Sequence, residues 1–216
     1  MKNIILWGAS GQAIVVEEFL SQLGYKLIAV FDNNKVVKSP FESIPIYHGT
    51  SGFYNWLKTE EDTKNVSYTV TIGGSKGQER VDIYKMLASS GLQGVSIVHP
   101  TSFVASSAFI ANGCQMLANT AICARTQLGL ATIVNTSAIL DHECIISKGV
   151  HIAPGATLAG CVQVGDFSFI GAGAIILPRI RIGKNTIIGA GSVVTKNIPD
   201  NVVAYGNPAR IIRDNF

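Results

Sequence analysis

The sequence predicts two domains of different class: a small parallel α/β sheet over residues 1–99, followed by a left-handed parallel β-helix over residues 100–216. Three observations support this division. Apolar runs alternate with helical patterns in the first half of the chain, and aliphatic residues recur every six positions in the second half. A chain of 216 residues also suffices for two hydrophobic cores.

Short apolar runs and amphipathic segments alternate through the first half. The predicted strands span residues 3–7, 27–31, 68–72 and 95–98. The predicted helices carry apolar stripes of Val16, Phe19, Leu20 and Leu23, and of Val81, Tyr84, Leu87 and Ala88. Alternation of this kind predicts a parallel sheet with right-handed crossovers, while residues 38–66 show a less regular pattern.

An aliphatic residue occupies every sixth position from Val104 to Val194, which gives sixteen such positions without an insertion. A small or β-branched residue lies four positions after each, as at Ala108 and Thr120. A helix would need period 3.6, and a flat strand would alternate without corners. A triangular coil fits period six, because three hexapeptides close one turn around an aliphatic axis. Residues after Val194 leave the period and are predicted to form a cap and a tail.

The composition narrows the classes of function. Charged residues make up 14% of the chain and the net charge is +3, which argues against nucleic acid binding and polybasic membrane attachment. No apolar run reaches membrane-spanning length, and the N-terminus lacks a signal-peptide pattern, so we expect a cytoplasmic protein with a small-molecule partner. Disulfides are not expected in the cytosol, and the four cysteines form no CxxC pair, which argues against a zinc site and against a redox motif.

Three loops are predicted to gather at the carboxyl edge of the N-terminal sheet. They are Gly8-Ala9-Ser10-Gly11, the strand end at Asp32, and Gly73-Gly74-Ser75. Ligands of α/β folds bind at this edge, and backbone N–H groups at a helix start bind phosphate. The first turn lacks a complete GxGxxG, and a tight strand-to-helix turn would need the same glycines. A nucleotide site is the favoured interpretation.

A gapless hexapeptide prism that ends in Gly206-Asn207-Pro208-Ala209-Arg210 resembles the hexapeptide-repeat acyltransferases. With the GASGQA turn and the segment from Asn135 to Cys144, the chain is similar to one family in particular. That family comprises the sialic acid O-acetyltransferases and the nucleotide-aminosugar N-acetyltransferases of bacillosamine and perosamine pathways. The resemblance covers nearly the whole chain. It implies acetyl-CoA as co-substrate, no metal, and a homotrimer that binds acetyl-CoA between adjacent prisms.

The resemblance implies that His142 is the general base and that Glu143 assists it. An amine that attacks a thioester loses a proton as the tetrahedral intermediate forms, and imidazole suits that task near neutral pH. The repeat frame puts His142 near a corner, two positions after the inward Leu140, although a solvated surface histidine is the alternative. Adjacent residues on a strand point to opposite sides, but the geometry of a corner allows His142 and Glu143 to meet. Asp141 is the competing carboxylate, and the resemblance favours Glu143.

The resemblance also implies an acetyl-CoA site, for which the candidates are Asn135, His151, Gly160, Gly173, Pro208 and Arg210. His151 should face outward, either near the acetyl group or only toward solvent, and Asn135 would contact ligand or stack within the coil. Gly160 would offer an N–H to the thioester oxygen or simply fit a corner. Arg210 would pair with the 3′-phosphate of CoA or help to cap the prism.

One cysteine raises the question of a covalent intermediate. The thiolate of Cys144 would accept the acetyl group. Its slot, however, is the small-residue corner position that Cys114 and Thr120 share, which favours burial. Direct transfer in a ternary complex is therefore predicted.

The N-terminal loops would bind a nucleotide-linked sugar through Gly8, Ser10, Gly11, Gln12, Asp32, Asn33, Gly73, Gly74 and Ser75. Within this set Asp32 and Asn33 are candidates for base or ribose contacts. Family members commonly carry histidine where this chain has Gln12. Glutamine keeps the hydrogen bonding to a diphosphate but loses a possible positive charge.

The resemblance, together with these loops, implies an N-acetyltransferase for the amino group of a nucleotide-diphosphate-linked 4-amino-4,6-dideoxysugar. It would serve bacterial surface-glycan synthesis, such as that of the lipopolysaccharide O-antigen. O-acetylation of sialic acid or another sugar hydroxyl is the alternative. A third hypothesis is a non-enzymatic trimeric scaffold or binding protein that uses the same prism.

Overall fold

A computed structural model describes residues 1–60 and 62–215 of the chain. The chain forms two compact units. The first comprises Met1–Ile72 and Asp82–Val95, and the second comprises Gly73–Val81 and Ser96–Phe216. The use of residues 1–99 and 100–216 as functional domains stays a prediction. Among the described residues, no helix has both the length and the apolar character needed to cross a membrane.

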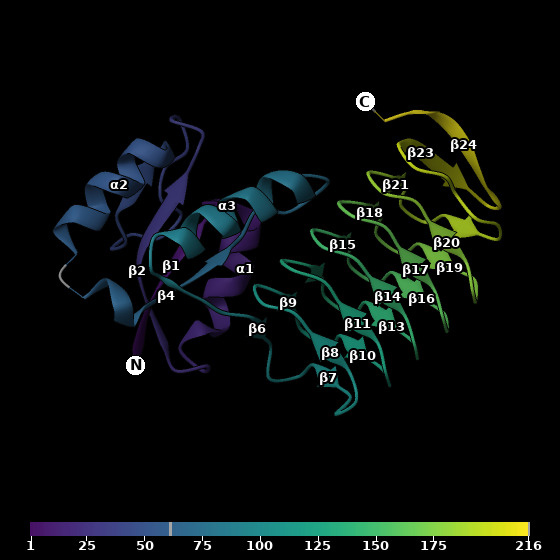
Figure 1. The fold of residues 1–216 in the computed structure, drawn as a ribbon, viewed down its shortest axis with the longest axis horizontal. Coiled ribbons are helices and arrows are strands. Elements are labelled where there is room, and N and C mark those ends of the chain that lie inside the picture. The colour runs from purple at the N-terminus through teal and green to yellow at the C-terminus, as the bar shows by residue number, and fades with distance from the viewer. Residues whose placement is uncertain (61, 216) are drawn as a thin grey trace. The chain divides into compact units, whose positions relative to one another are not determined.

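The first unit contains a parallel sheet of five strands in the order β3-β2-β1-β4-β5 (Figure 1). Its strands are β1 (Lys2–Trp7), β2 (Tyr25–Asp32), β3 (Ile46–His48), β4 (Val66–Val70) and β5 (Gln93–Gly94). The helical elements are α1 (Gly11–Leu20), α2 (Gly49–Thr59), the 3-10 turn η1 (Thr63–Asn65) and α3 (Gly77–Ser89), whose first residues belong to the second unit. The predicted parallel α/β sheet is confirmed.

The sequence pattern misses β3 and α2. Helix α2 contains Gly49 and Gly52, which favour helix poorly, and it buries only Phe53 and Trp56, so its apolar stripe is short. The strand predicted at residues 95–98 exists only at residues 97–98, and its assignment to the N-terminal sheet is wrong. Gln93–Gly94 forms the fifth strand of the sheet, whereas Ile97–Val98 pairs with β9 in the second unit.

An aromatic cluster packs α2 against the sheet of the first unit. Phe31 stacks on Trp7 with ring centroids 5.5 Å apart. Phe53 and Trp56 of α2 contact Phe31 edge-on, with centroids 5.5 and 5.3 Å away. Aromatic pairs of this kind contribute about 0.5–1.5 kcal/mol beyond the area that they bury. The cluster steadies the carboxyl ends of β1 and β2, which lead into two of the predicted ligand loops.

The second unit is a left-handed β-helix with three faces, and the strands contributed by the coils are parallel within each face (Figure 1). The first face consists of β7 (Phe103–Val104), β10 (Ala121–Ile122), β13 (Ile139–Leu140), β16 (Thr157–Leu158), β19 (Ile175–Ile176) and β22 (Val193–Val194). The second face consists of β8 (Phe109–Ile110), β11 (Gln127–Leu128), β14 (Ile145–Ile146), β17 (Gln163–Val164) and β20 (Arg181–Ile182). The third face consists of β6 (Ile97–Val98), β9 (Gln115–Met116), β12 (Ile133–Val134), β15 (His151–Ile152), β18 (Phe169–Ile170), β21 (Ile187–Ile188), β23 (Val202–Gly206) and β24 (Ala209–Asp214).

Strands 18 residues apart pair with one another, so each coil contains three hexapeptides. Ala121, for example, pairs with Phe103 on one side and with Ile139 on the other. The aliphatic position of the repeat points to the axis, where Ile122 and Leu140 are completely buried. The hairpin of β23 and β24 extends the third face beyond the last repeats.

Each corner of the β-helix is a two-residue turn whose second residue usually adopts a left-handed backbone conformation. Glu143 (φ 58°) and Cys161 (φ 62°) are examples without glycine. This conformation costs about 1–2 kcal/mol for a side chain other than glycine. We call the corner between the first and second faces the first corner; its turns are residues 106–107, 124–125, 142–143, 160–161 and 178–179.

The alternation of inward and outward side chains predicts unequal effects for two adjacent isoleucines. Ile176 is completely buried on the axis, whereas Ile175 is 44% exposed on the first face. Ile176→Ala should lower the free energy of unfolding by about 2–5 kcal/mol, and Ile175→Ala by less than about 1 kcal/mol. Urea unfolding of the two variants measures the difference. Equal losses would contradict the inward frame.

Candidate active site

His142 lies at the first corner with its side chain outside the core, 51% exposed. The corner is held by the backbone: the Glu143 N–H donates to the Ala124 carbonyl at 2.8 Å, and the Cys161 N–H donates to the His142 carbonyl at 2.9 Å. The Asp141 carboxylate accepts a hydrogen bond from the His142 N–H at 2.7 Å. Asp141 therefore caps the turn, and its contact with His142 is made to the backbone.

Glu143 reaches the imidazole of the residue before it. Its Oε2 lies 3.1 Å from His142 Nδ1, and its Oε1 lies 3.8 Å from Arg125 Nη1. The left-handed backbone at Glu143 turns the side chain out of the strict alternation of a strand, which is why the two neighbours meet. An ionised carboxylate only accepts hydrogen bonds, so the proton of a neutral His142 sits on Nδ1 and the lone pair on Nε2 is available to a substrate.

Gly160, one coil above His142 at the same corner, gives the imidazole its space. A Cβ atom at residue 160 would collide with Nε2 of His142. Ala124 and Pro178 occupy the same turn position on other coils, so the backbone there tolerates a side chain. The requirement for glycine therefore comes from the neighbouring ring.

Asn135 and His151 lie together on the third face. The Asn135 side-chain amide lies 3.2 Å from His151 Nε2, and its oxygen accepts a hydrogen bond from the Thr136 N–H at 2.8 Å. His151 points outward from the axis, as the frame predicts, but it is only 5% exposed. Its ring contacts Phe169 edge-on, and the backbone of Gly74 lies near it. The alternative that His151 is a solvated surface residue is therefore wrong.

Arg80, on the first turn of α3, is a site-forming residue that the sequence analysis missed. It is completely buried, and its guanidinium donates to the carbonyls of Ala131 at 2.8 Å, Gly149 at 2.7 Å and Val150 at 3.2 Å. Burial lowers its pKa to about 10, which leaves the group charged at neutral pH. Arg80 lies one helical turn before Tyr84, on the predicted apolar stripe of the helix. A charged residue on such a stripe is the sequence feature that could have identified it.

Burial, and after it the charge of Arg80, lower the pKa of His151 to about 3. The ring is therefore neutral at physiological pH. A neutral imidazole takes part in hydrogen bonds but adds no positive charge to a ligand site.

Cys144 lies inside the coil. Its side chain is completely buried, and the thiol donates to the Ala159 carbonyl at 3.3 Å. Burial raises the pKa of the Cys144 thiol to about 11. A buried, protonated thiol is a poor nucleophile, which agrees with the small-residue reading of this position.

The remaining acetyl-CoA candidates lie away from the first corner. Gly173 is the second residue of the turn after β18, with φ 66°. Pro208 follows a cis peptide bond in the loop between β23 and β24, and Arg210 lies in β24. Within one chain the structure thus brings together His142, Glu143 and Gly160, and separately Asn135 and His151.

Two of the predicted nucleotide loops meet in the first unit. The Gly8 N–H donates to the Phe31 carbonyl at 2.7 Å, and the Ala9 N–H donates to Asp32 Oδ2 at 2.9 Å. Gly8 has φ 109°, and a Cβ there would lie 2.6 Å from the Thr71 carbonyl oxygen, so only glycine fits. Ser10 immediately precedes α1, which begins with Gly11 and Gln12, and Asn33 follows Asp32. Gly73, Gly74 and Ser75 belong to the second unit.

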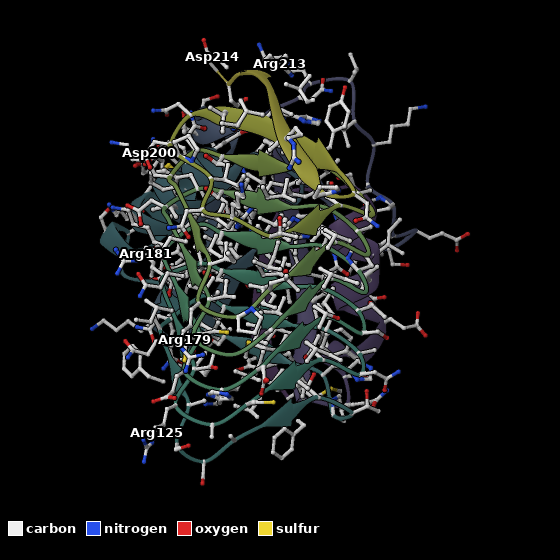
Figure 2. All side chains as sticks on the ribbon, turned by 90° about the vertical axis from the view of Figure 1, so that its right-hand side faces the viewer. Arg125, Arg179, Arg181, Asp200, Arg213 and Asp214 are labelled. Atoms are coloured by element: carbon white, nitrogen blue, oxygen red, sulfur yellow. The ribbon has the colours of Figure 1, made fainter. Side chains whose placement is uncertain are left out.

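Positively charged side chains flank the first corner. Arg125 and Arg179 belong to its turns, Arg181 lies on β20, and Figure 2 shows all three along one edge of the β-helix. An open pocket of about 580 Å³ on the second face is lined in part by Arg181, Lys184 and Gln163. Cationic groups at a cleft favour the approach of anionic ligands.

Because His151 is buried in its neutral form, we predict that it contributes to a loss of folding stability at acid pH. Unfolded His151 takes up a proton below pH 6.5 and folded His151 only near pH 3, so its stabilising contribution is lost as the pH falls through this window. His151→Gln should remove about 3 kcal/mol of the stability that the wild type loses between pH 7 and pH 4. Urea unfolding at both pH values measures this, with His99→Gln as the control. An unchanged loss in His151→Gln would refute the assignment.

Comparison with known proteins agrees with both units. Residues 3–87 match the family model described as PglD N-terminal domain, and residues 161–196 match that of the bacterial transferase hexapeptide (six repeats). The curated GDP-perosamine N-acetyltransferase of Escherichia coli O157:H7 is 33% identical over 108 residues, which span 50% of this chain and 48% of that protein.

Solved structures match over nearly the whole chain. A mutant of perosamine N-acetyltransferase from Caulobacter crescentus, in complex with CoA and GDP-perosamine, is 30% identical with a TM-score of 0.89, covering 99% of this chain and 98% of that one. The acetyltransferase domain of PglB from Neisseria gonorrhoeae, in complex with acetyl coenzyme A, is 29% identical with a TM-score of 0.85, covering 98% and 99%. The chain therefore belongs to the family of hexapeptide-repeat sugar acetyltransferases.

Proposed function

We propose that the protein transfers an acetyl group from acetyl-CoA to the amino group of a nucleotide-diphosphate-linked 4-amino-4,6-dideoxysugar. The observation that carries the proposal is the His142–Glu143 pair, with Nδ1 and Oε2 3.1 Å apart at an exposed corner. The acceptor class rests on relatives whose names specify GDP-perosamine. Surface-glycan synthesis in the cytoplasm, including that of an O-antigen, is the setting that fits such a substrate.

His142 acts as the general base in the proposed reaction. The acceptor nitrogen attacks the thioester carbon, and Nε2 takes the proton that the nitrogen loses as the tetrahedral intermediate forms. Glu143, which accepts the Nδ1 hydrogen bond, stabilises the imidazolium that results. When the C–S bond breaks, the proton on Nε2 passes to the departing thiolate of CoA.

The Gly160 amide is the proposed donor to the oxygen of the intermediate. Gly160 is the first residue of its corner turn, beside the His142 ring. A backbone donor adjacent to the base would stabilise the negative charge where it develops. Transfer is direct, because Cys144, the thiol considered for an acetyl-enzyme, is buried and protonated.

The complete site is shared between copies of the chain. His142 lies at the first corner, whereas Asn135 and His151 lie on the third face, which is the opposite side of a triangular coil. A single chain holds these groups apart, so a neighbouring prism has to supply one set. A homotrimer, with acetyl-CoA between adjacent prisms and Gly173, Pro208 and Arg210 along its path, meets this requirement.

Loops of the N-terminal half of the chain bind the nucleotide part of the acceptor. Gly8, Ser10, Gly11 and Gln12 form the turn into α1, where backbone N–H groups suit a diphosphate. Asp32 and Asn33 would contact the base or ribose, and Gly73, Gly74 and Ser75 would make the remaining contacts with the nucleotide-linked sugar. Residues 1–99 thus serve the acceptor, and residues 100–216 serve acetyl-CoA and the chemistry.

Release of CoA from acetyl-CoA in the presence of candidate acceptors tests the proposal. The wild-type protein is assayed with UDP-, GDP- and dTDP-linked 4-amino sugars and with free sialic acid. The His142→Ala variant is then compared with the wild type, and His99→Ala serves as the control. We expect one nucleotide-linked amine to be acetylated, and His142→Ala to lower kcat by about 100-fold or more. Unchanged turnover in His142→Ala would disprove the mechanism, and preference for sialic acid would replace the N-acetyl assignment by O-acetylation.

A further inference from the structure

Three side chains with different donor atoms converge at the first corner. His142 and Glu143 belong to one coil, and Cys161 occupies the position of Glu143 on the next coil. One donor atom from each residue, an imidazole nitrogen, a carboxylate oxygen and a thiol sulfur, lies within 4.8 Å of the others. This combination of imidazole, thiol and carboxylate is one that Zn²⁺ prefers in proteins.

The separations between donors suit one tetrahedral ion. Glu143 Oε2 lies 3.1 Å from His142 Nδ1 and 3.9 Å from Cys161 Sγ. With bonds of about 2.0–2.3 Å, the ligands of a tetrahedral zinc ion are about 3.3–3.8 Å apart. Small side-chain movements therefore suffice to place the three donors on one ion.

The corner holds these donors in place before an ion arrives. Glu143 and Cys161 share the left-handed backbone conformation, so their side chains leave stacked turns in the same way. The Cys161 N–H donates to the His142 carbonyl at 2.9 Å, which joins the two coils beneath the cluster. Arg125 lies 3.8 Å from Oε1 of Glu143, and the other oxygen, Oε2, faces His142 and Cys161. Ligands on rigid elements lose little freedom when they bind a metal.

We propose that Nδ1 of His142, Oε2 of Glu143 and Sγ of Cys161 form a binding site for Zn²⁺, with water in the fourth position. The thiol of Cys161 releases its proton to solvent on binding. A metal on Nδ1 moves the single proton of the neutral imidazole to Nε2. Nε2 then has no lone pair for a substrate, so bound Zn²⁺ inhibits acetyl transfer reversibly.

Binding of the ion depends only on this geometry, whereas inhibition rests on the proposed function of His142. Cys161 is the residue that separates the two roles, because it is outside the proposed acetyl-transfer machinery. Cys123, another partly exposed cysteine that is not in the cluster, provides the matched control.

Titration of the full-length protein with Co²⁺ tests binding, because a thiolate ligand gives Co²⁺ a charge-transfer absorption band. The wild type and Cys123→Ser should show the band, and Cys161→Ser should lack it. Competition for Zn²⁺ with a chromogenic chelator, which needs no Co²⁺ band, should give an apparent Kd at least about tenfold weaker for Cys161→Ser. No band in the wild type, or an equal band in Cys161→Ser, would overturn the site, whether or not any acceptor is acetylated.

Inhibition is measured with the acceptor that supports turnover. Zn²⁺ should inhibit the wild type and Cys123→Ser, and EDTA should restore their activity. Cys161→Ser should keep its basal turnover and need at least about tenfold more Zn²⁺ for the same inhibition. Equal inhibition of Cys161→Ser and the wild type would contradict an inhibitory site at this corner, even if Co²⁺ binds there.

Discussion

The hydrogen-bonded closure of the coil every 18 residues is the constraint on which the candidate active site depends. It stacks residues 18 positions apart at one strand spacing, about 4.8 Å, along every face and corner. His142 therefore has Gly160 directly above it, and Glu143 has Arg125 and Cys161 on either side. The repeat therefore sets the placement of Gly160 and Arg125 beside the His142–Glu143 pair, and a shift of one residue in the frame would dismantle the candidate site.

The left-handed corner conformation brings two polar side chains of one turn into contact. On an extended strand His142 and Glu143 would point to opposite sides, but at the turn they meet through a 3.1 Å contact. The conformational cost at Glu143, about 1–2 kcal/mol, is offset by the inter-coil hydrogen bonds and by the aliphatic axis. A rigid, strained turn thus presents a polar pair outside a core whose axis is lined by aliphatic side chains.

The period-six pattern was sufficient to predict the β-helix, the inward residues, the exposed corner for His142 and the burial of Cys144. Each depends only on position within the repeat. The pattern could not predict the burial of His151, because that depends on the backbone of residues 73–81 and on Arg80, which are distant in sequence. It also missed β3 and α2, whose few buried side chains pack through tertiary aromatic contacts. Glycines and strand ends predicted the loops that we propose for the nucleotide, but the hydrogen bond from the Ala9 N–H to Asp32 could be seen only in the fold.

The proposed mechanism requires free space above the His142 ring, and Gly160→Ala tests this requirement most directly. Alanine keeps the backbone N–H and adds only the Cβ that meets the imidazole. Ala124→Gly, at the same turn position one coil below, is the matched control. Steady-state kinetics should show kcat reduced by about 100-fold in Gly160→Ala, with an unchanged melting temperature and little effect in the control. A wild-type kcat in Gly160→Ala would contradict the requirement for free space above the His142 ring.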